Sequence, residues 1–203
     1  MPAQHSREAI RVLGIAGSLR EGSHNRALLR AAQELAPAEM TIVTFDHLGS
    51  LPLYNEDVLA QGVPTPVAAL KEAIQKADAL LIATPEYNYS IPGVLKNAID
   101  WASRPAETSP LNGKPVALMG ASTGSFGTVR AQMHLRQVCV YTNMLALTRP
   151  QVLVARAREK FDQQGRLTDE KSIGFVRELL QALLKWTLRL RRGVEPEGDR
   201  SCA

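Results

Sequence analysis

Short apolar segments alternate with longer segments of mixed polarity along most of the chain. The first of them, residues 10–16, is bounded by polar residues before it and by Gly17 and Ser18 after it. Segments of this kind, hydrophobic throughout, are typical of strands buried on both faces of a sheet. We expect five such strands, at residues 10–16, 40–45, 79–84, 115–121 and 151–154.

The segments between these strands carry apolar residues at helical spacing. We expect helices at residues 26–35, 65–77, 94–103, 129–145 and 169–190. Ser23 or Asn25 is available as an N-cap for the first helix, and Thr65 as the capping residue before Pro66 for the second. The last helix is expected to pack on the sheet through an apolar stripe formed by Ile173, Val176, Leu180, Leu183 and Leu184.

This order of elements predicts an α/β fold. Five strands alternating with five helices indicate a doubly wound five-stranded parallel sheet with helices on both faces. Since no repeat or linker is visible, we expect a single domain over residues 1–192 and a flexible C-terminal tail at 193–203. Ligands of such sheets bind beyond the carboxyl ends of the strands, so the loops after strands one, three and four are the candidate site.

The composition narrows the class of protein. With 203 residues, 45% of them hydrophobic and 22% charged, the chain resembles ordinary soluble globular proteins. Its apolar runs are far shorter than the roughly 20 residues of a membrane span. Residues 1–8 are polar and offer no apolar core for a secretory signal. We therefore expect a cytoplasmic protein without a membrane partner.

Charge, cysteine and histidine exclude several other functions. The formal charge of +4 arises largely near the C-terminus, where few aromatic residues accompany the cations, so a solvated helix face is favoured over nucleic-acid binding. Those cations are Lys185, Arg189, Arg191, Arg192 and Arg200. Cys139 and Cys202 cannot build a disulfide framework or a four-cysteine zinc site, and the four histidines lack metal-ligand spacing. No metal is expected.

The loop after the first strand, residues 17–25, has the features of an anion site. Backbone N–H groups and the positive end of the following helix would point outward there, beside hydroxyls, an amide and the Arg20 guanidinium. The loop lacks the patterns of nucleoside triphosphate and dinucleotide binding. A monophosphate is the remaining candidate, and a well-capped structural turn is the alternative.

The other two loops suit a flat ligand. Residues 85–93 combine two tyrosines, an amide and two prolines, and a stiff loop of this kind can clasp a planar heterocycle such as a flavin. The alternative is a surface loop with Tyr87 or Tyr89 tucked into the core. Residues 122–128 add small side chains that allow close backbone approach, a weak signal by itself.

Several motifs in series identify a family. They are Gly17-Ser18-Leu19-Arg20-x-x-Ser23-x-Asn25, Pro85-Glu86-Tyr87-Asn88-Tyr89-Ser90-x-Pro92-Gly93-x-Leu95-Lys96-Asn97-Ala98-Ile99-Asp100-Trp101, Gly113-Lys114-Pro115, Gly120-Ala121-Ser122-x-Gly124, Arg130-Ala131-Gln132 and His134-Leu135-Arg136. Over residues 11–154 the chain closely resembles the NAD(P)H-dependent FMN reductase family, which includes quinone, chromate and azo-dye reductases.

The resemblance implies a flavodoxin-like fold, bound FMN, and NADPH or NADH as hydride donor. It implies reduction of small flavin, quinone, azo or chromate-type acceptors in a ping-pong cycle, with the chemistry on FMN N5 and no catalytic side chain. By position, Ser18, Arg20, Ser23 and Asn25 would hold the phosphate. Pro85, Glu86, Tyr87 and Asn88 would line the ring, with Ser122 and Gly124 nearby.

Some features depart from the family or stay open. Many relatives have two glycines where this chain has Gly127-Thr128. The resemblance also implies a homodimer or homotetramer, with residues 54–57 as an interface loop or, alternatively, an ordinary polar connection. A non-catalytic electron carrier or redox-sensing flavin protein is the alternative function, although carriers usually dock through acidic surfaces and this chain is basic.

Overall fold

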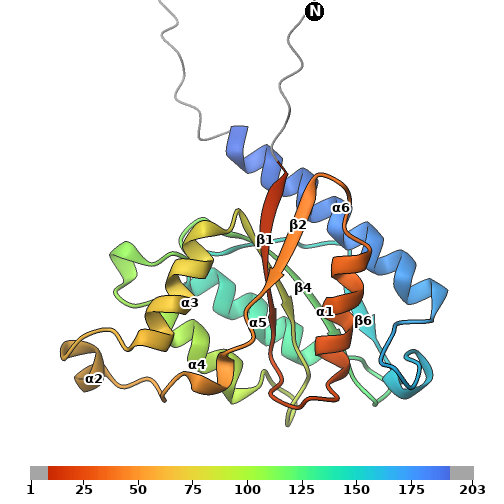
Figure 1. Ribbon diagram of the computed structural model, residues 1–203, viewed down its shortest axis with the longest axis horizontal. Helices are drawn as coiled ribbons and strands as arrows, with labels where there is room; N and C mark the ends of the chain where they lie inside the picture. The colour runs from red at the N-terminus through yellow and green to blue at the C-terminus, as the bar shows by residue number, and fades with distance from the viewer. Residues whose placement is uncertain (1–8, 193–203) are drawn as a thin grey trace, which may run out of the picture.

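A parallel sheet occupies the centre of the fold in the computed structural model, which describes residues 9–192 (Figure 1). Its strands are β1 (Ile10–Ala16), β2 (Met40–Thr44), β3 (Ala79–Ala83), β4 (Pro115–Ala121), β5 (Leu145–Ala146) and β6 (Val152–Val154). The order is β2-β1-β3-β4-β5, with β6 also paired to β4. Because this order is that of flavodoxin-like doubly wound sheets, the predicted fold class is confirmed.

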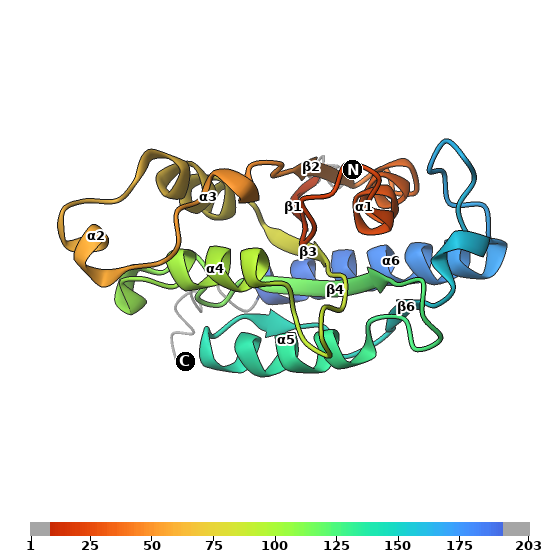
Figure 2. The same cartoon turned by 90° about the horizontal axis from the view of Figure 1, so that it is seen from below.

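Helices cover both faces of the sheet. They are α1 (His24–Glu34), α2 (Glu56–Ala60), α3 (Thr65–Lys76), α4 (Gly93–Ala102), α5 (Val129–Tyr141) and α6 (Glu170–Arg192). One hydrophobic core joins α1 and α6 to the sheet, and a second joins α3, α4 and α5 to the opposite face. Figure 2 views the molecule from below and shows α1 on one side and α3 with α4 on the other.

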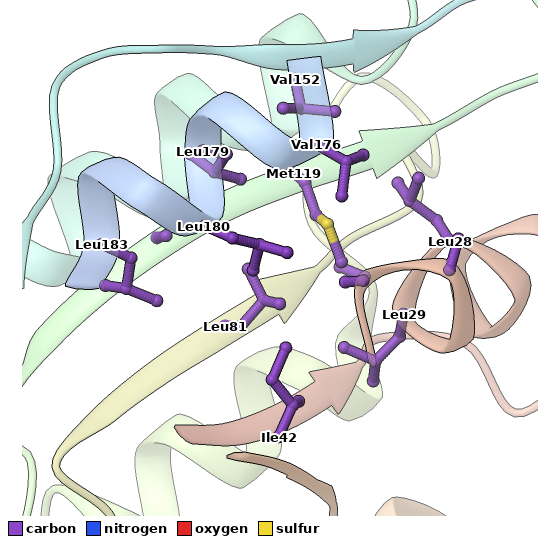
Figure 3. Packing of buried hydrophobic residues seen from close by; sticks show 14 of the residues in the cluster. Leu28, Leu29, Ile42, Leu81, Met119, Val152, Val176, Leu179, Leu180 and Leu183 are labelled. Carbon is purple, nitrogen blue, oxygen red and sulfur yellow. The ribbon is translucent and has the colours of Figure 1, made fainter. Parts of the chain in front are cut away.

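The apolar stripe predicted for the last helix is confirmed. Val176, Leu180 and Leu183 of α6 are buried against the sheet together with Leu28 of α1 and Met119 of β4 (Figure 3). Ile173 packs at the edge of this core and Leu184 lies inside it. The core fixes α1, and hence the loop before it, relative to the end of β4.

The region after α5 differs from the prediction. The helix expected to reach residue 145 ends at Tyr141, because Asn143 adopts a left-handed φ of 54°. The Met144 N–H then donates to the Cys139 carbonyl at 2.9 Å, which closes the helix end. Residues 145–146 form an additional short strand, and the predicted fifth strand is β6. The apolar run concealed this helix end because Met144 and Leu145 continue the helical hydrophobic pattern.

One smaller expectation was also wrong, and one short helix was missed. Thr65 lies inside α3, whose N-cap position is Pro64 without a side-chain cap. The short helix α2 was not predicted; Asn55 caps it by accepting from the Asp57 N–H at 2.8 Å, and none of its residues is buried. A helix this short, without a buried stripe, leaves no periodic signal in the sequence.

Some expectations fall outside residues 9–192. The tail at 193–203, Arg200 and Cys202 are not among the described residues, and the single domain stays a prediction. Within the described range, none of the helices combines the length and hydropathy that crossing a membrane requires. The same range contains no group of three His, Cys, Asp or Glu side chains arranged to hold a metal ion.

Candidate functional site

The three predicted loops meet at one edge of the sheet, at the carboxyl ends of β1, β3 and β4. The Ser18 and Tyr87 hydroxyls lie 3.3 Å apart and connect the first loop to the second. The Asn25 side chain connects the first loop to the backbone of Ala121, the last residue of β4 before the third loop. In Figure 1 the turns that follow β1 and β3 lie together at the lower edge of the sheet.

The first loop is shaped as an anion cradle. Ser23 caps α1 and accepts from the Asn25 and Arg26 N–H groups, while the buried Ser18 hydroxyl accepts from the Arg20 N–H at 3.4 Å. Within residues 9–192, the backbone N–H groups of Leu19, Glu21 and Gly22 donate to no protein acceptor. These free donors and the Arg20 side chain at the positive end of α1 match the needs of a phosphate.

Two residues to which the sequence analysis gave no role belong to the electrostatic surroundings of this loop, namely His24 within it and Arg158 outside it. Burial lowers the pKa of His24, and the positive charges of Arg20 and Arg158 lower it further. Arg158 belongs to a 3₁₀ turn at Ala157–Glu159, which follows β6 and is remote in the sequence. No local sequence motif indicates a role for Arg158, because only the folded chain brings its charge close to the first loop.

The second loop contains a tight two-residue turn at its tip. Tyr87 and Ser90 exchange backbone hydrogen bonds, both of 2.9 Å, around Asn88 and Tyr89. Both central residues have positive φ, 49° and 68°, as this turn type demands. Tyr87 is 49% exposed and Tyr89 67%, so the alternative of a tyrosine tucked into the core was wrong.

Glu86 ties the second loop to the start of α5. Its carboxylate accepts from the Arg130 guanidinium at 2.8 Å and from the backbone N–H groups of Arg130 and Ala131 at 2.9 and 3.3 Å. Burial alone would raise the pKa of Glu86, but these hydrogen bonds together lower it below its ordinary value. The carboxylate is thus held in its ionised form.

The third loop is hydrogen-bonded to the segment that follows β6. The Ser122 hydroxyl accepts from the Gly124 N–H at 3.0 Å, and the Gly124 carbonyl accepts from the Arg156 N–H at 2.9 Å. Gly127 has a φ of 62° and lies so close to the Leu153 backbone that a Cβ atom would stand 3.0 Å from it. Glycine is therefore required there, whatever residue follows.

The donors that residues 9–192 bring together at these loops fit a flavin mononucleotide. The anion cradle and the stiff second loop are in contact through Ser18 and Tyr87. A ligand whose phosphate is joined to a planar ring requires two such sites side by side. Cys139 is buried between α5 and the sheet, and burial raises the pKa of its thiol to about 11. A thiolate at neutral pH is accordingly disfavoured.

Comparison with known proteins gives a consistent result. Residues 10–159 match the model of the family described as NADPH-dependent FMN reductase. The chain is 55% identical over 182 residues to an NAD(P)H-dependent FMN reductase of Pseudomonas aeruginosa, covering 90% of this chain and 97% of that protein. It is 39% identical over 186 residues to a quinone reductase of Escherichia coli, covering 91% and 98%.

A solved structure agrees with the family model and with these relatives. The flavoenzyme FerB of Paracoccus denitrificans, an NAD(P)H:(acceptor) oxidoreductase, superposes with a TM-score of 0.82 at 36% identity, covering 89% of this chain and 98% of that one. The family model alone spans well over half of the sequence. The chain belongs to the NADPH-dependent FMN reductase family.

Proposed function

We propose that the chain binds FMN across its three loops and passes electrons from NADPH or NADH to small acceptors, quinones foremost. The observation that carries this proposal is the direct joining of an anion cradle to a stiff, exposed loop through Ser18 and Tyr87. Quinones are favoured because a relative with 39% identity over nearly its full length is named a quinone reductase. Flavin, azo and chromate-type acceptors remain within the proposal.

At the phosphate end, the four predicted residues would have different tasks. Arg20 and the Ser18 hydroxyl would contact the phosphate, together with the free N–H groups of the loop. The Ser23 hydroxyl oxygen already accepts two backbone N–H groups, which leaves its own O–H to donate to the phosphate. Both the nitrogen and the oxygen of the Asn25 side-chain amide are hydrogen-bonded to Ala121, so the main task of Asn25 would be to fix the loop.

At the ring end, the backbone matters more than the side chains. The Glu86 carboxylate is engaged by α5, so Glu86 would present main-chain groups to the ring. Pro85 is buried and would stiffen the same stretch, while Tyr87 and Asn88 are exposed and available. Ser122 and Gly124 would approach the ring from the third loop.

FMN supplies hydride acceptance and one- or two-electron release when it is bound. The chain's task would be to hold the cofactor in one orientation, leave one face of the ring open, and set the potential through hydrogen bonds and charge. Use of the same open face by both substrates in turn supports a ping-pong cycle. The supply of NADPH and NADH in the cytoplasm supports a cytoplasmic location for this activity.

A second copy of the chain would complete the assembly as a homodimer or homotetramer. A groove of about 670 Å³ runs between α4 and α5 and reaches Ser90 of the second loop. At the end of α5, Val140 and Tyr141 are 82% and 78% exposed, and apolar side chains of this kind often mark subunit contacts. The predicted interface loop is fastened to α4 beside it, where the Tyr54 N–H donates to Asn97 Oδ1 at 2.8 Å.

The assembly is tested by the mass in solution. Light scattering coupled to gel filtration should give a multiple of the 22.2 kDa chain mass, and Tyr141→Lys should reduce it. Phe175→Lys, at an exposed position on α6, should leave the mass unchanged. A single-chain mass for the original protein would reject the oligomer.

The central experiment is the visible spectrum of the purified protein, after reconstitution with FMN if necessary. Bands at about 370 and 450 nm are expected, and they should bleach on anaerobic addition of NADPH or NADH and return on addition of benzoquinone. A bound flavin that stays oxidised would favour the carrier or sensor alternative. A protein that takes up no FMN would reject the proposed function.

A further inference from the structure

Arg130 contacts both loops that would clasp the flavin ring. Its guanidinium carbon lies 3.9 Å from the centre of the Tyr89 ring, at the tip of the second loop. The same carbon lies 4.9 Å from the centre of the Phe126 ring, in the third loop. Both distances are within the range at which a cation is attracted to an aromatic face.

The guanidinium is itself held in place. Glu86 accepts from the Arg130 side chain at 2.8 Å, and the same carboxylate accepts from the first backbone N–H groups of α5. The Arg130 side chain is 31% exposed and that of Glu86 only 11%, so solvent screens the pair little. A second tie runs in parallel, with His134 Nδ1 3.0 Å from the Ser90 hydroxyl.

The backbone of the second loop needs such support. Tyr89 has a φ of 68°, in a region that residues with a Cβ atom rarely adopt, and Asn88 before it has a φ of 49°. Residues in this conformation persist where surrounding contacts hold them, and they concentrate at ligand-binding sites. Tyr89 is 67% exposed, so core packing does not provide that support.

We propose that Arg130 is a positioning residue that couples the second loop to the third, so that the two sides of the ring site are set together. The inference rests on the proposed function, because it concerns how the same site binds FMN. Phe126 is 65% exposed and, like Tyr89, has little packing of its own. Because the guanidinium contacts both aromatic rings, a displacement of one loop would displace the other.

A double-mutant cycle on the full-length chain tests this coupling. The variants are Tyr89→Ala, Phe126→Ala and the pair, each made in the original chain and in Arg130→Lys, which keeps the charge facing Glu86 and loses the planar contact. The readout is the dissociation constant of FMN, titrated into apo-protein by fluorescence. The melting temperature of each apo-protein is measured alongside, with Lys76→Met as the control for losing an exposed ion pair.

If Arg130 couples the two loops, the effects of the Tyr89 and Phe126 substitutions on FMN affinity should not multiply in the double variant. Each single ring variant should weaken FMN binding by about two- to fivefold, and the pair should weaken it no further, because either change breaks the link. In Arg130→Lys, binding should already be weaker by about the same factor, and the ring variants should add little. The apo-protein melting temperatures should change no more than that of Lys76→Met does.

Riboflavin separates the ring from the phosphate end. Arg130→Lys should weaken riboflavin and FMN by the same factor, because the coupled loops face the ring that both share. Ring variants whose effects multiply in the original chain, or an Arg130→Lys protein with unchanged FMN affinity, would overturn the coupling while the proposed function stands. An original chain without FMN affinity would overturn both.

Discussion

Asn25 and the backbone of Ala121 exchange two hydrogen bonds, both of 2.9 Å, between residues 96 positions apart in the sequence. The Asn25 Nδ2 donates to the Ala121 carbonyl, and the Ala121 N–H donates to Asn25 Oδ1. Both residues are buried, so neither backbone group has water as a substitute partner. This exchange locks the start of α1 to the end of β4.

The first prediction follows from that exchange. Asn25→Ala leaves a buried N–H and a buried carbonyl unpaired, which should lower the free energy of unfolding by about 2 to 4 kcal/mol. Urea denaturation of the apo-protein measures it. Asn112→Ala is the matched control, since Asn112 Nδ2 donates to the Ala106 carbonyl at the surface and should cost about 0.5 kcal/mol. Equal effects of the two variants would contradict the assigned role of Asn25.

Two glycines should respond to the same substitution with opposite sign. A Cβ atom at Gly120 would stand 2.0 Å from Thr128 Oγ1 and 2.4 Å from the Thr84 carbonyl oxygen, whereas at Gly174 within α6 nothing lies within 4 Å. Gly120→Ala should therefore destabilise the protein by at least about 2 kcal/mol. Gly174→Ala should stabilise it by about 0.5 to 1 kcal/mol. Thermal unfolding of both variants tests the pair, and a stable Gly120→Ala protein would contradict the close approach.

The sequence was informative about most of the local features. The five predicted strands and the three loops follow from runs of neighbouring residues, and all five strands are present in the sheet. Ser23, one of the two N-cap candidates for the first helix, is the residue that caps it. The end of α5 was missed because a left-handed Asn143 is one residue within a continuous apolar pattern. Local propensity carries little information about such a position.

The contacts that join the loops were not predictable in this way. Arg130 was visible as part of a motif, yet its contact with Tyr89 and Phe126 depends on how two loops and one helix meet. Arg158 approaches the first loop only because β6 ends beside it. Contacts between distant segments depend on the order of the strands in the sheet. The alternation of strands and helices in the sequence restricts that order but does not determine it.

Arg20 is expected to carry much of the affinity for the FMN phosphate. A charge-assisted hydrogen bond contributes about 1.5 to 3 kcal/mol, so Arg20→Ala should weaken FMN binding by about ten- to a hundredfold. Riboflavin binding should change far less, because riboflavin lacks the phosphate. The control is Arg177→Ala, at an exposed position on α6, which removes the same charge without touching the loop. An FMN affinity that Arg20→Ala leaves unchanged would remove this assignment.

The start of α6 should make stability depend on pH. Hydrogen bonds from Lys160 and then from Ser172 lower the pKa of Asp169 from 3.8 to about 2. Since the folded value is the lower one, the stabilisation is complete above about pH 4 and is lost as the pH falls towards about 2. Asp169→Asn should destabilise the protein by about 1 kcal/mol at neutral pH, because Asp169 accepts from the Ser172 N–H in the first turn. Urea unfolding from pH 6 down to pH 3 should show the two proteins converging; a gap that stays constant would mean that the ionised carboxylate contributes nothing.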